Sequence, residues 1–294
     1  MTVDQYMGSI EVAILLLVIS LLFKKVLQYV VMVDYPEPFT NLLCQGMVLK
    51  DGGKMSKSVG NVVSPEEIVG KYGADTARLF ILFAAPPEKD LEWSDQGVEG
   101  SYRFLKRVWN IVGKYEDIQT EEKGKLSSDE FALRRKLHQT IKKVTEDLDG
   151  KFAFNTAISA IMELVNDMYR FVEAHEIIEA SLSGELVRNL LILLAPFVPH
   201  MTEELWQGAG QKEESIHLAA WPACDESALV VDEVELAVQV NGKVRATISV
   251  PVAMAREEIG EKAQALPEIQ KFTEGKTIVK VIVVPKRIVN IVVK

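Results

Sequence analysis

Hydrophobic residues recur at helical spacing through the middle of this chain. Between residues 127 and 207, apolar side chains fall three or four positions apart in successive stripes, which is typical of helices that bury one face. Ser127 and Glu130 form the pattern of a capping box, and Gly150 can end the first helix. The pattern predicts a helix bundle. Its stripes are Leu137, Ile141, Val144 and Leu148, then Ile158, Ile161, Val165, Met168 and Val172, and lastly residues 186–194, closed by Pro196.

The C-terminal part of the chain, after Trp221-Pro222, has the pattern of strands instead. Asn241-Gly242 separates two strand-like runs and is a strong hairpin signal, because both residues accept positive φ. A compact α+β module is therefore predicted over residues 226–294. Its predicted elements are strands at 234–240 and 243–250, a helix at 254–265, and strands at 278–284 and 288–293.

Residues 12–23 form the most hydrophobic run of the chain. Crossing a membrane takes about 20 apolar residues, and this run is interrupted by Lys24 and Lys25, so a buried helix is predicted. Asp4 and Glu11 lie where a signal peptide would carry positive charge. A membrane-associated protein is the alternative interpretation, and it depends on this region alone.

A helical connecting region is predicted over residues 64–115. Ser64-Pro65-Glu66-Glu67 places an N-cap serine before a proline at the first helical position, with a glutamate three residues after the cap. Gly73 and Pro86-Pro87 interrupt the region. The preceding segment is predicted to contain a linker at Pro36 and Pro38 and a strand at 45–49.

Composition fits a multidomain soluble protein, because 294 residues with 48% hydrophobic and 26% charged side chains suffice for two or three modest cores. Cys44 and Cys224 lie far apart, so neither a disulfide framework nor a metal site is indicated, and a reducing cytoplasm is predicted. The net charge of -9 argues against indiscriminate nucleic-acid binding, although local charge can differ from the total. Residues 271–294 carry six cations against one glutamate, a local charge of +5.

Residues 50–63 contain the clearest candidate chemistry in the chain. Lys54 and Lys57 lie three positions apart, interleaved with Ser56 and Ser58 and flanked by glycines. Ammonium groups, hydroxyls and glycine-flanked amides together suit a polyphosphate, and we predict that the two lysines stabilise a leaving pyrophosphate. The alternative is a solvated surface turn of ordinary composition.

Lys54-Met55-Ser56-Lys57-Ser58 resembles the KMSKS signature loop of class I aminoacyl-tRNA synthetases. The surrounding sequence resembles the leucyl-tRNA synthetases in particular, in family order and over essentially the whole chain. The motifs that carry this resemblance include Val3-Asp4-Gln5-Tyr6, Gln45-Gly46-Met47-Val48, Tyr72-Gly73-Ala74-Asp75-Thr76, Leu91-Glu92-Trp93-Ser94, residues 97–100 and 103–109, residues 195–200 with 203–206, and residues 239–245.

The resemblance implies a multidomain, mainly α fold that corresponds to the C-terminal third of such an enzyme. The His-x-Gly-His element of the family and its editing domain have no counterpart here. The chain is therefore interpreted as a natural small subunit or a fragment that needs an N-terminal catalytic and editing part. The implied domains are the edge of a Rossmann-like catalytic domain (1–63), a connecting, stem-contact region (64–115), an anticodon-binding-type helical bundle (116–225) and an α+β tRNA-binding domain (226–294).

The same resemblance implies ATP-dependent leucylation of tRNA(Leu), with leucine and ATP as substrates and Mg²⁺ accompanying ATP. Lys54, Ser56, Lys57 and Ser58 would bind the phosphates of ATP. On the resemblance alone, Gln45 and Met47 would border its adenine. The cations expected to bind tRNA are Arg103 and Arg107 in the connecting region and Lys243, Arg245, Lys286 and Arg287 in the C-terminal module.

Two alternatives stay open at this stage. The cations of the connecting region can simply solvate a helix face, and Lys243 can belong to an ordinary soluble hairpin. The chain can also be a non-catalytic module that binds tRNA or completes a partner. For His200, a capping or packing role is expected rather than metal binding, because no other ligands cluster nearby.

The chain departs from the family pattern at five positions. Val12, Leu16, Ile19 and Leu21 replace residues that are typically two histidines, a tyrosine and an arginine, and Val59 replaces a third lysine. In the family the helix with the first four borders the adenylate pocket. The departures therefore put adenine recognition in doubt and predict diminished catalysis or an altered chain.

Overall fold

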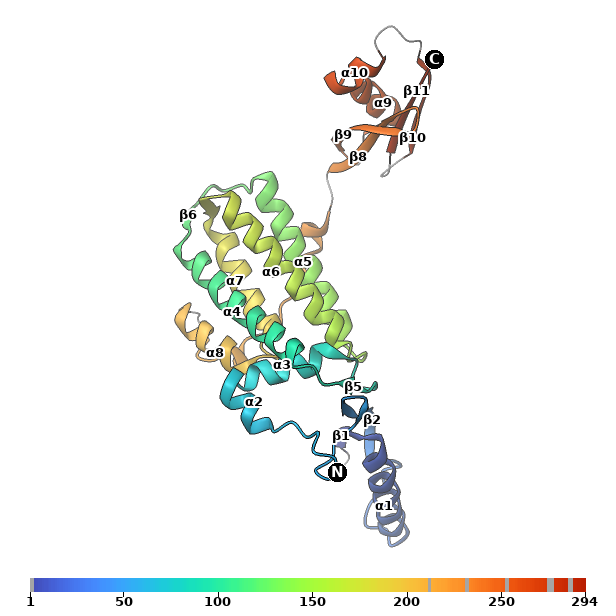
Figure 1. Cartoon of the computed structure of the whole chain (residues 1–294), viewed down its shortest axis with the longest axis vertical. Helices are drawn as coiled ribbons and strands as arrows, with labels where there is room; N and C mark the ends of the chain where they lie inside the picture. The colour runs from blue at the N-terminus through green and yellow to red at the C-terminus, as the bar shows by residue number, and fades with distance from the viewer. Residues whose placement is uncertain (1–2, 211–212, 231–232, 252–253, 274–277, 285–287) are drawn as a thin grey trace. The chain divides into compact units, whose positions relative to one another are not determined.

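The computed structural model describes residues 3–210, 213–230, 233–251, 254–273, 278–284 and 288–294 (Figure 1). The chain divides into two compact units, Met1–Ala228 and Leu229–Lys294. The first unit consists mainly of helices, and the second unit contains a mixed sheet. The predicted mainly α, multidomain fold is therefore confirmed. The finer division at residues 63, 115 and 225 stays a prediction.

The N-terminal part of the first unit is a β-α-β arrangement with parallel strands. Strand β1 (Val3–Ser9) pairs in parallel with β2 (Phe39–Gln45), and helix α1 (Ile10–Tyr29) forms the crossover between them. Parallel strands need such a crossover, because a tight turn cannot join them. This part of the chain therefore contains a parallel strand pair with a crossover helix, although the sequence pattern had not indicated β1. The Rossmann-like catalytic edge stays a prediction.

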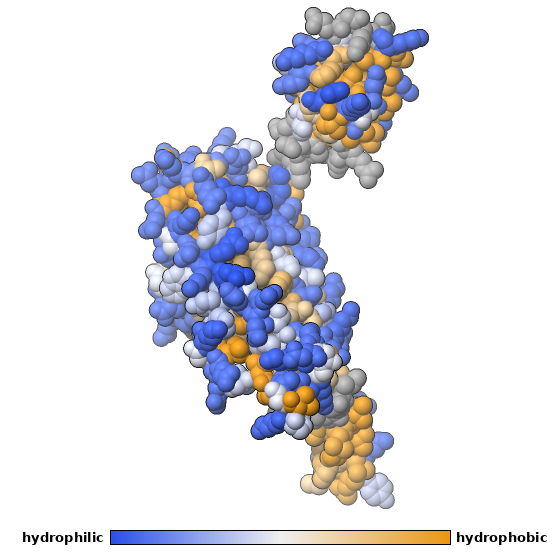
Figure 2. All heavy atoms as spheres, viewed as in Figure 1, coloured by the Kyte–Doolittle hydropathy of each residue, from blue (hydrophilic) through white to orange (hydrophobic). Residues whose placement is uncertain are grey.

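The prediction that the apolar run forms a buried helix was correct for the helix and wrong for its burial. Ile14 is 64% exposed, Leu22 61% and Phe23 67%, and α1 forms the strongly hydrophobic end of the first unit in Figure 2. The reason is that α1 packs chiefly against β1 and β2 among the described elements. One end is tied down where the Lys24 ammonium donates to Gln28 Oε1 at 2.8 Å and also to the Pro36 carbonyl.

Two of the family departures, Leu16 and Ile19, lie on this exposed helix at 41% and 42% exposure, whereas the side chain of Val12 lies outside the described residues. Among the residues that the structure describes, no helix combines the length and hydropathy needed to cross a membrane.

The strand expected at residues 45–49 is in fact two strands separated at Gly46 and Met47. The amide of Gly46 donates to Pro87 O at 2.9 Å, and that of Met47 donates to Asp90 Oδ1 at 2.7 Å. These bonds turn the chain away from β2 and into a second sheet of order β4-β3-β5. Its strands are β3 (Val48–Lys50), β4 (Gly53–Lys54) and β5 (Leu91–Glu92).

The predicted connecting region is largely helical, with a break at Gly73 and another around Pro86-Pro87. Pro65 begins a helix after Ser64, as predicted, but the side chain of this N-cap serine makes no capping hydrogen bond. The third helix of the region instead begins where Ser94 Oγ accepts from Gly97 N at 3.1 Å. The helices are α2 (Pro65–Tyr72), α3 (Ala74–Ala84) and α4 (Asp95–Asp117).

The bundle forms as the hydrophobic stripes predicted, and the side chains of its core are buried. Leu137, Ile161, Leu164 and Leu190 are 0% exposed. The Ser127–Glu130 capping box is confirmed, with Glu130 Oε2 accepting from Ser127 N at 2.7 Å. The helices are α5 (Ser128–Leu148), α6 (Phe154–Ala174), α7 (Ala180–Leu194) and α8 (Pro199–Gly208), accompanied by the strands β6 (Gln119–Glu121) and β7 (Ile177–Glu179) and the short helices η1 (Ile216–Leu218) and η2 (Glu226–Leu229).

Two charged residues of α3 join the connecting region to the bundle. The Asp75 carboxylate, 8% exposed, accepts from His200 Nδ1 at 2.8 Å and from Met201 N at 2.7 Å at the start of α8. One turn later, Arg78 donates to Phe197 O at 3.2 Å and to Pro196 O at 3.0 Å, just after α7 ends. An anion at a helix start and a cation at a helix end both complement the helix dipoles.

The second unit is the predicted α+β module, with strand order β10-β11-β8-β9. Asn241 and Gly242 have φ of 49° and 79° at the hairpin turn, as expected. The sequence pattern missed a second helix. The first helix ends at Ala265, and Pro267 then begins the second. The elements are β8 (Glu233–Val240), β9 (Lys243–Pro251), α9 (Arg256–Ala265), α10 (Pro267–Thr273), β10 (Ile278–Val284) and β11 (Ile288–Val293).

Candidate functional site

The lysine loop begins with a tight hairpin between β3 and β4. Asp51 and Gly52, with φ of 57° and 73°, form the turn, and Leu49 and Lys50 pair with Lys54 and Gly53. Positive φ at both central positions favours glycine, asparagine or aspartate, which explains the Asp-Gly sequence here. The hairpin is also held from the other side of the sheet, because Gly52 N donates to Glu92 Oε1 at 3.1 Å.

The segment after the hairpin folds back onto it through the side chain of Asn61. Its Oδ1 accepts from Ser56 N at 2.8 Å, and its Nδ2 donates to Lys50 O at 3.1 Å and to Lys54 O at 3.4 Å. Asn61 is not among the residues predicted from the sequence. Its position among glycine and serine residues is typical of any polar turn, so no pattern distinguished it.

The hydroxyl groups of the loop bond mainly to one another. Ser56 Oγ lies 2.7 Å from Ser58 Oγ and also accepts from Ser58 N at 3.3 Å. Lys57 lies between these serines and is exposed, as is Lys54 at the end of β4. The structure thus brings Lys54, Ser56, Lys57 and Ser58 into one folded loop that presents two cations to solvent.

Gln45 and Met47 lie beside the break between β2 and β3. Gln45 lines a cavity of about 200 Å³ together with Met7 and Gly46, whereas Met47 does not line it. Gly46 fits here because it has no side chain: a Cβ atom would lie 2.2 Å from the carbonyl carbon of Lys89. The close approach of two backbone segments therefore shapes this side of the cavity.

Arg103 and Arg107 lie on α4 and line a larger cavity of about 720 Å³, whose other walls include Phe80, Phe104 and Glu92. The Arg103 guanidinium pairs with Glu99 at 3.1 Å on the exposed helix surface. Arg107 donates to Asn166 Oδ1 at 2.8 Å, and its guanidinium lies 5.0 Å from the ring centroid of Tyr169. These two cations share one helix with Lys106, which lies 4.6 Å from the Tyr102 ring, and Lys114, which lies 5.2 Å from the Tyr169 ring.

Two of the predicted tRNA-binding cations, Lys243 and Arg245, lie at the hairpin of the second unit. Lys243 begins β9, and the exposed Arg245 places its guanidinium 4.2 Å from the Phe272 ring of α10. Asn241 locks the turn, because its Nδ2 donates to Val293 O at 3.1 Å and its Oδ1 accepts from Val293 N at 3.0 Å. Lys286 and Arg287, the other two predicted tRNA-binding residues, lie outside the described residues.

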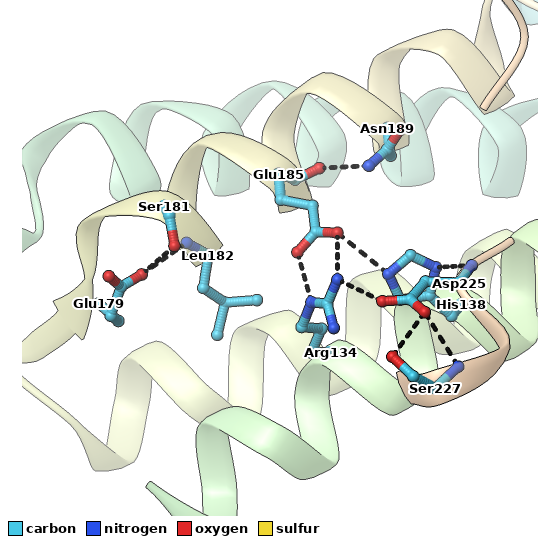
Figure 3. A network of polar contacts seen from close by, with 9 residues as sticks. All are labelled: Arg134, His138, Glu179, Ser181, Leu182, Glu185, Asn189, Asp225 and Ser227. Carbon is cyan, nitrogen blue, oxygen red and sulfur yellow. Dashed lines mark hydrogen bonds and ion pairs between the residues drawn. The ribbon is translucent and has the colours of Figure 1, made fainter. Parts of the chain in front are cut away.

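A polar network inside the bundle is a second candidate for chemistry (Figure 3). Arg134 of α5 bonds Glu185 of α7 at 2.8 Å and Asp225 at 2.9 Å. His138 Nδ1 accepts from Asp225 N at 3.1 Å, which leaves Nε2–H to donate to Glu185 Oε1 at 3.0 Å. The buried ring is thus held as one tautomer between two fixed partners.

Electrostatics favour a structural role for this network. Burial raises the pKa of Glu185, but hydrogen bonds from His138 and Arg134 outweigh it and lower the pKa overall. Hydrogen bonds from Ser227 and Arg134 lower the pKa of Asp225 to about 2. Both carboxylates are therefore kept ionised and engaged by their partners, which suits holding α5, α7 and the segment before η2 together.

The described residues contain no cluster of three or more histidine, cysteine or acidic side chains that could hold a metal ion. His200, at the start of α8, bonds instead to Asp75. The His200 side chain is 74% exposed and α8 has no side-chain capping hydrogen bond, so neither the expected capping nor the expected packing role is observed.

Two family models match the chain. That of the class I tRNA synthetases (I, L, M and V) matches residues 4–94, and that of the anticodon-binding domain of tRNA ligase matches residues 130–259. The lysine loop lies within the first match, and most of the bundle and the Asn-Gly hairpin lie within the second.

The chain is also similar to solved structures. One is a ternary complex of Agrobacterium radiobacter K84 agnB2 LeuRS with tRNA and LeuAMS: 35% identity, a TM-score of 0.71, and coverage of 99% of this chain but 37% of that one. Another is Mycobacterium tuberculosis methionyl-tRNA synthetase with methionyl-adenylate, at 21% identity, a TM-score of 0.55 and coverage of 71% of this chain and 44% of that one. This chain thus spans little more than a third of the LeuRS it matches. It belongs to the class I aminoacyl-tRNA synthetases and carries their anticodon-binding domain.

Proposed function

We propose that this chain supplies the pyrophosphate-binding loop and the tRNA-binding surfaces of a leucine–tRNA ligase. The observation that carries the proposal is the folded lysine loop, in which Lys54 and Lys57 are exposed on a hairpin held by Glu92 and Asn61. The 35% identity to a LeuRS over 99% of the chain supports leucine as the amino acid.

The reaction has two steps. The carboxylate of leucine attacks the α-phosphorus of ATP, the bond to the bridging oxygen breaks, and pyrophosphate leaves as leucyl-adenylate forms. A terminal ribose hydroxyl of tRNA(Leu) then attacks the leucyl carbonyl, loses its proton and releases AMP. Lys54 and Lys57 donate hydrogen bonds to the oxygens of the pyrophosphate as its negative charge grows, which lowers the barrier of the first step.

The other contacts with ATP and tRNA are assigned to the residues that were predicted from the sequence. Ser56 and Ser58 add donors near the phosphates, while Gln45 and Met47 border the adenine. Mg²⁺ accompanies the ATP substrate and screens the charge of its phosphates. Arg103, Arg107, Lys243 and Arg245 bind the tRNA backbone, and Lys286 and Arg287 add positive charge to the second unit. The cytoplasm stays the predicted compartment.

The exposed helix α1 supports a partner for the first unit. Leu15, Leu22 and Phe23 are more than 60% exposed, and contiguous apolar surface of this kind marks an interface. We assign this surface to an N-terminal catalytic part, which would also supply the remaining strands of the parallel sheet and the other ATP-binding residues. A chain without that part binds tRNA but has little catalytic activity.

The test is leucine-dependent exchange of pyrophosphate into ATP by the chain supplemented with the N-terminal part of a LeuRS. Exchange should appear only in the mixture, and Lys57→Ala should lower its rate at least tenfold. Lys151→Ala removes an equally exposed lysine from the bundle and serves as the matched control. An unchanged rate for Lys57→Ala would overturn the catalytic assignment.

A second candidate is a non-catalytic module that binds tRNA. It is favoured by the exposed α1 and by Leu16, Ile19 and Val59, which replace polar residues of the family pattern. Binding of the purified chain to a leucine tRNA and to a noncognate tRNA, at near-physiological salt, distinguishes the two functions when combined with the exchange assay. Cognate preference without exchange in any mixture would favour the module.

A further inference from the structure

We infer that Asn61 is the residue that positions the lysine loop, acting on the reaction through Lys57. This inference rests on the proposed function and deepens it. Asn61 carries one amide oxygen and one NH₂ group, and all of these groups are used by backbone partners within the loop. Three of the four hydrogen bonds that an asparagine side chain can make are therefore directed to the backbone of the loop, which indicates a structural role for Asn61.

The three partners of Asn61 lie at the three points that define the loop. Lys50 ends β3, Lys54 ends β4, and Ser56 begins the turn that carries Lys57. Asn61 therefore joins the end of the loop to both strands of the hairpin and to the turn. The backbone adds only local closure here, with Val59 N and Gly60 N both donating to Ser56 O at 3.1 Å and 3.0 Å.

Asn61 and Lys57, the lysine on which it is inferred to act, differ in burial. Asn61 is half-buried beneath the loop, whereas Lys57 and Ser58 are exposed. The hairpin strands are three and two residues long and cannot by themselves order the residues that follow. A preorganised loop loses less conformational entropy when its ammonium groups bind a polyphosphate. Loss of the Asn61 hydrogen bonds should therefore lower the rate of the chemical step.

The chemistry of the amide specifies the informative substitutions. Asn61→Ala removes all three hydrogen bonds. Asn61→Asp keeps an acceptor for Ser56 N, but turns a carboxylate oxygen toward the carbonyls of Lys50 and Lys54 and adds a negative charge beside two lysines. Asn110→Ala, at an exposed position of α4, removes an asparagine outside the loop and is the matched control.

The first measurement is amide hydrogen exchange on the 294-residue chain. Asn61→Ala should accelerate exchange of the Ser56 amide at least tenfold, with the melting temperature unchanged within 2 °C, whereas Asn61→Asp should leave that amide protected. Unchanged protection of the Ser56 amide in Asn61→Ala would overturn the inference. It would leave the proposed function unaffected, because this measurement concerns only the loop without substrate.

The second measurement is a double-mutant cycle in the pyrophosphate exchange assay with the N-terminal part added. Asn61→Ala should lower kcat at least tenfold with less than a threefold change in the KM for leucine. In the Lys57→Ala background it should lower kcat less than twofold. Equal losses in both backgrounds would show that Asn61 does not act through Lys57. An unaffected Lys57→Ala variant would overturn the proposed function and this coupling together.

Discussion

The helix bundle buries its leucine side chains, whereas the N-terminal β-α-β arrangement leaves those of its helix exposed. Leu190 and Leu191 of α7 are 0% exposed, whereas Leu15 and Leu22 of α1 are 63% and 61% exposed. Both helices are rich in leucine, so composition does not separate them. The difference is in the neighbouring elements: α7 packs against α5, α6 and α8, whereas α1 packs chiefly against β1 and β2 among the elements that the structure describes.

A similar contrast holds between the bundle, which is stabilised by its own core, and the lysine loop, which carries the proposed catalytic residues. The bundle closes its own core and fixes α3 through Asp75 and Arg78. The lysine loop depends on short strands and on one asparagine side chain. Sites that engage a large substrate are commonly less stable than the scaffold that carries them. The predictions below test this division.

The largest effect is expected for a buried leucine of the bundle. Leu164→Ala should lower the free energy of unfolding by about 2 to 5 kcal/mol, because it leaves a cavity in a core with 0% exposure. Leu22→Ala on α1 should change it by less than about 0.5 kcal/mol. Urea unfolding of both variants measures the difference. Similar losses would mean that α1 is buried in solution.

A smaller effect is expected where the bundle holds the connecting region. Asp75→Ala should lower the free energy of unfolding by about 1 to 3 kcal/mol, because the backbone N–H of Met201 and the His200 ring lose a buried charged acceptor. Asp75→Asn keeps one acceptor oxygen and should lose less. Thermal unfolding of the two variants checks this order, and equal losses would contradict the role of the charge.

The buried Glu130 of the capping box predicts a pH dependence of bundle stability. Burial alone would raise the pKa of Glu130, but hydrogen bonds from Ser127 and Lys123 outweigh it and lower the pKa to about 2. Because the folded pKa lies below the ordinary value of 4.5, this stabilisation is present above pH 4.5 and is lost as the pH falls toward 2. The loss is on the order of 3 kcal/mol.

Melting temperatures between pH 6 and pH 2 test this dependence. Glu130→Gln should flatten the part of the profile below about pH 4.5, where the native carboxylate resists protonation. Glu121→Gln changes an exposed glutamate of β6 and is the control. An identical slope for Glu130→Gln and the unmodified chain would rule out the capping box as the source.

The smallest effect is expected at the hairpin of the second unit, which has a hydrophobic core of its own. Asn241→Ala should destabilise this unit by about 1 to 2 kcal/mol, since alanine is strained at a φ of 49° and the bonds to Val293 are lost. Asn241→Gly relieves the strain and should lose less. Amide exchange of β8 and β9 measures both, and no change in Asn241→Ala would mean that strand pairing alone holds the turn.

The chain's periodicity and turn residues predicted the elements that depend on local physics. The stripes of the bundle, the Ser127–Glu130 capping box and the Asn241-Gly242 hairpin all form as expected, because helical spacing, caps and positive-φ residues act within a few positions. The lysine loop was likewise identified from Lys54 and Lys57. Its functional role stays a prediction.

Contacts between distant segments account for what the pattern missed. The strand at 45–49 breaks because Gly46 and Met47 bond to Pro87 and Asp90, some 40 positions away. Asn61 gained its role only when the loop folded back onto the ends of β3 and β4. Burial of α1 failed for the same reason: hydrophobicity drives a helix toward a core, but only neighbouring elements provide one, and the described elements leave its outer face uncovered.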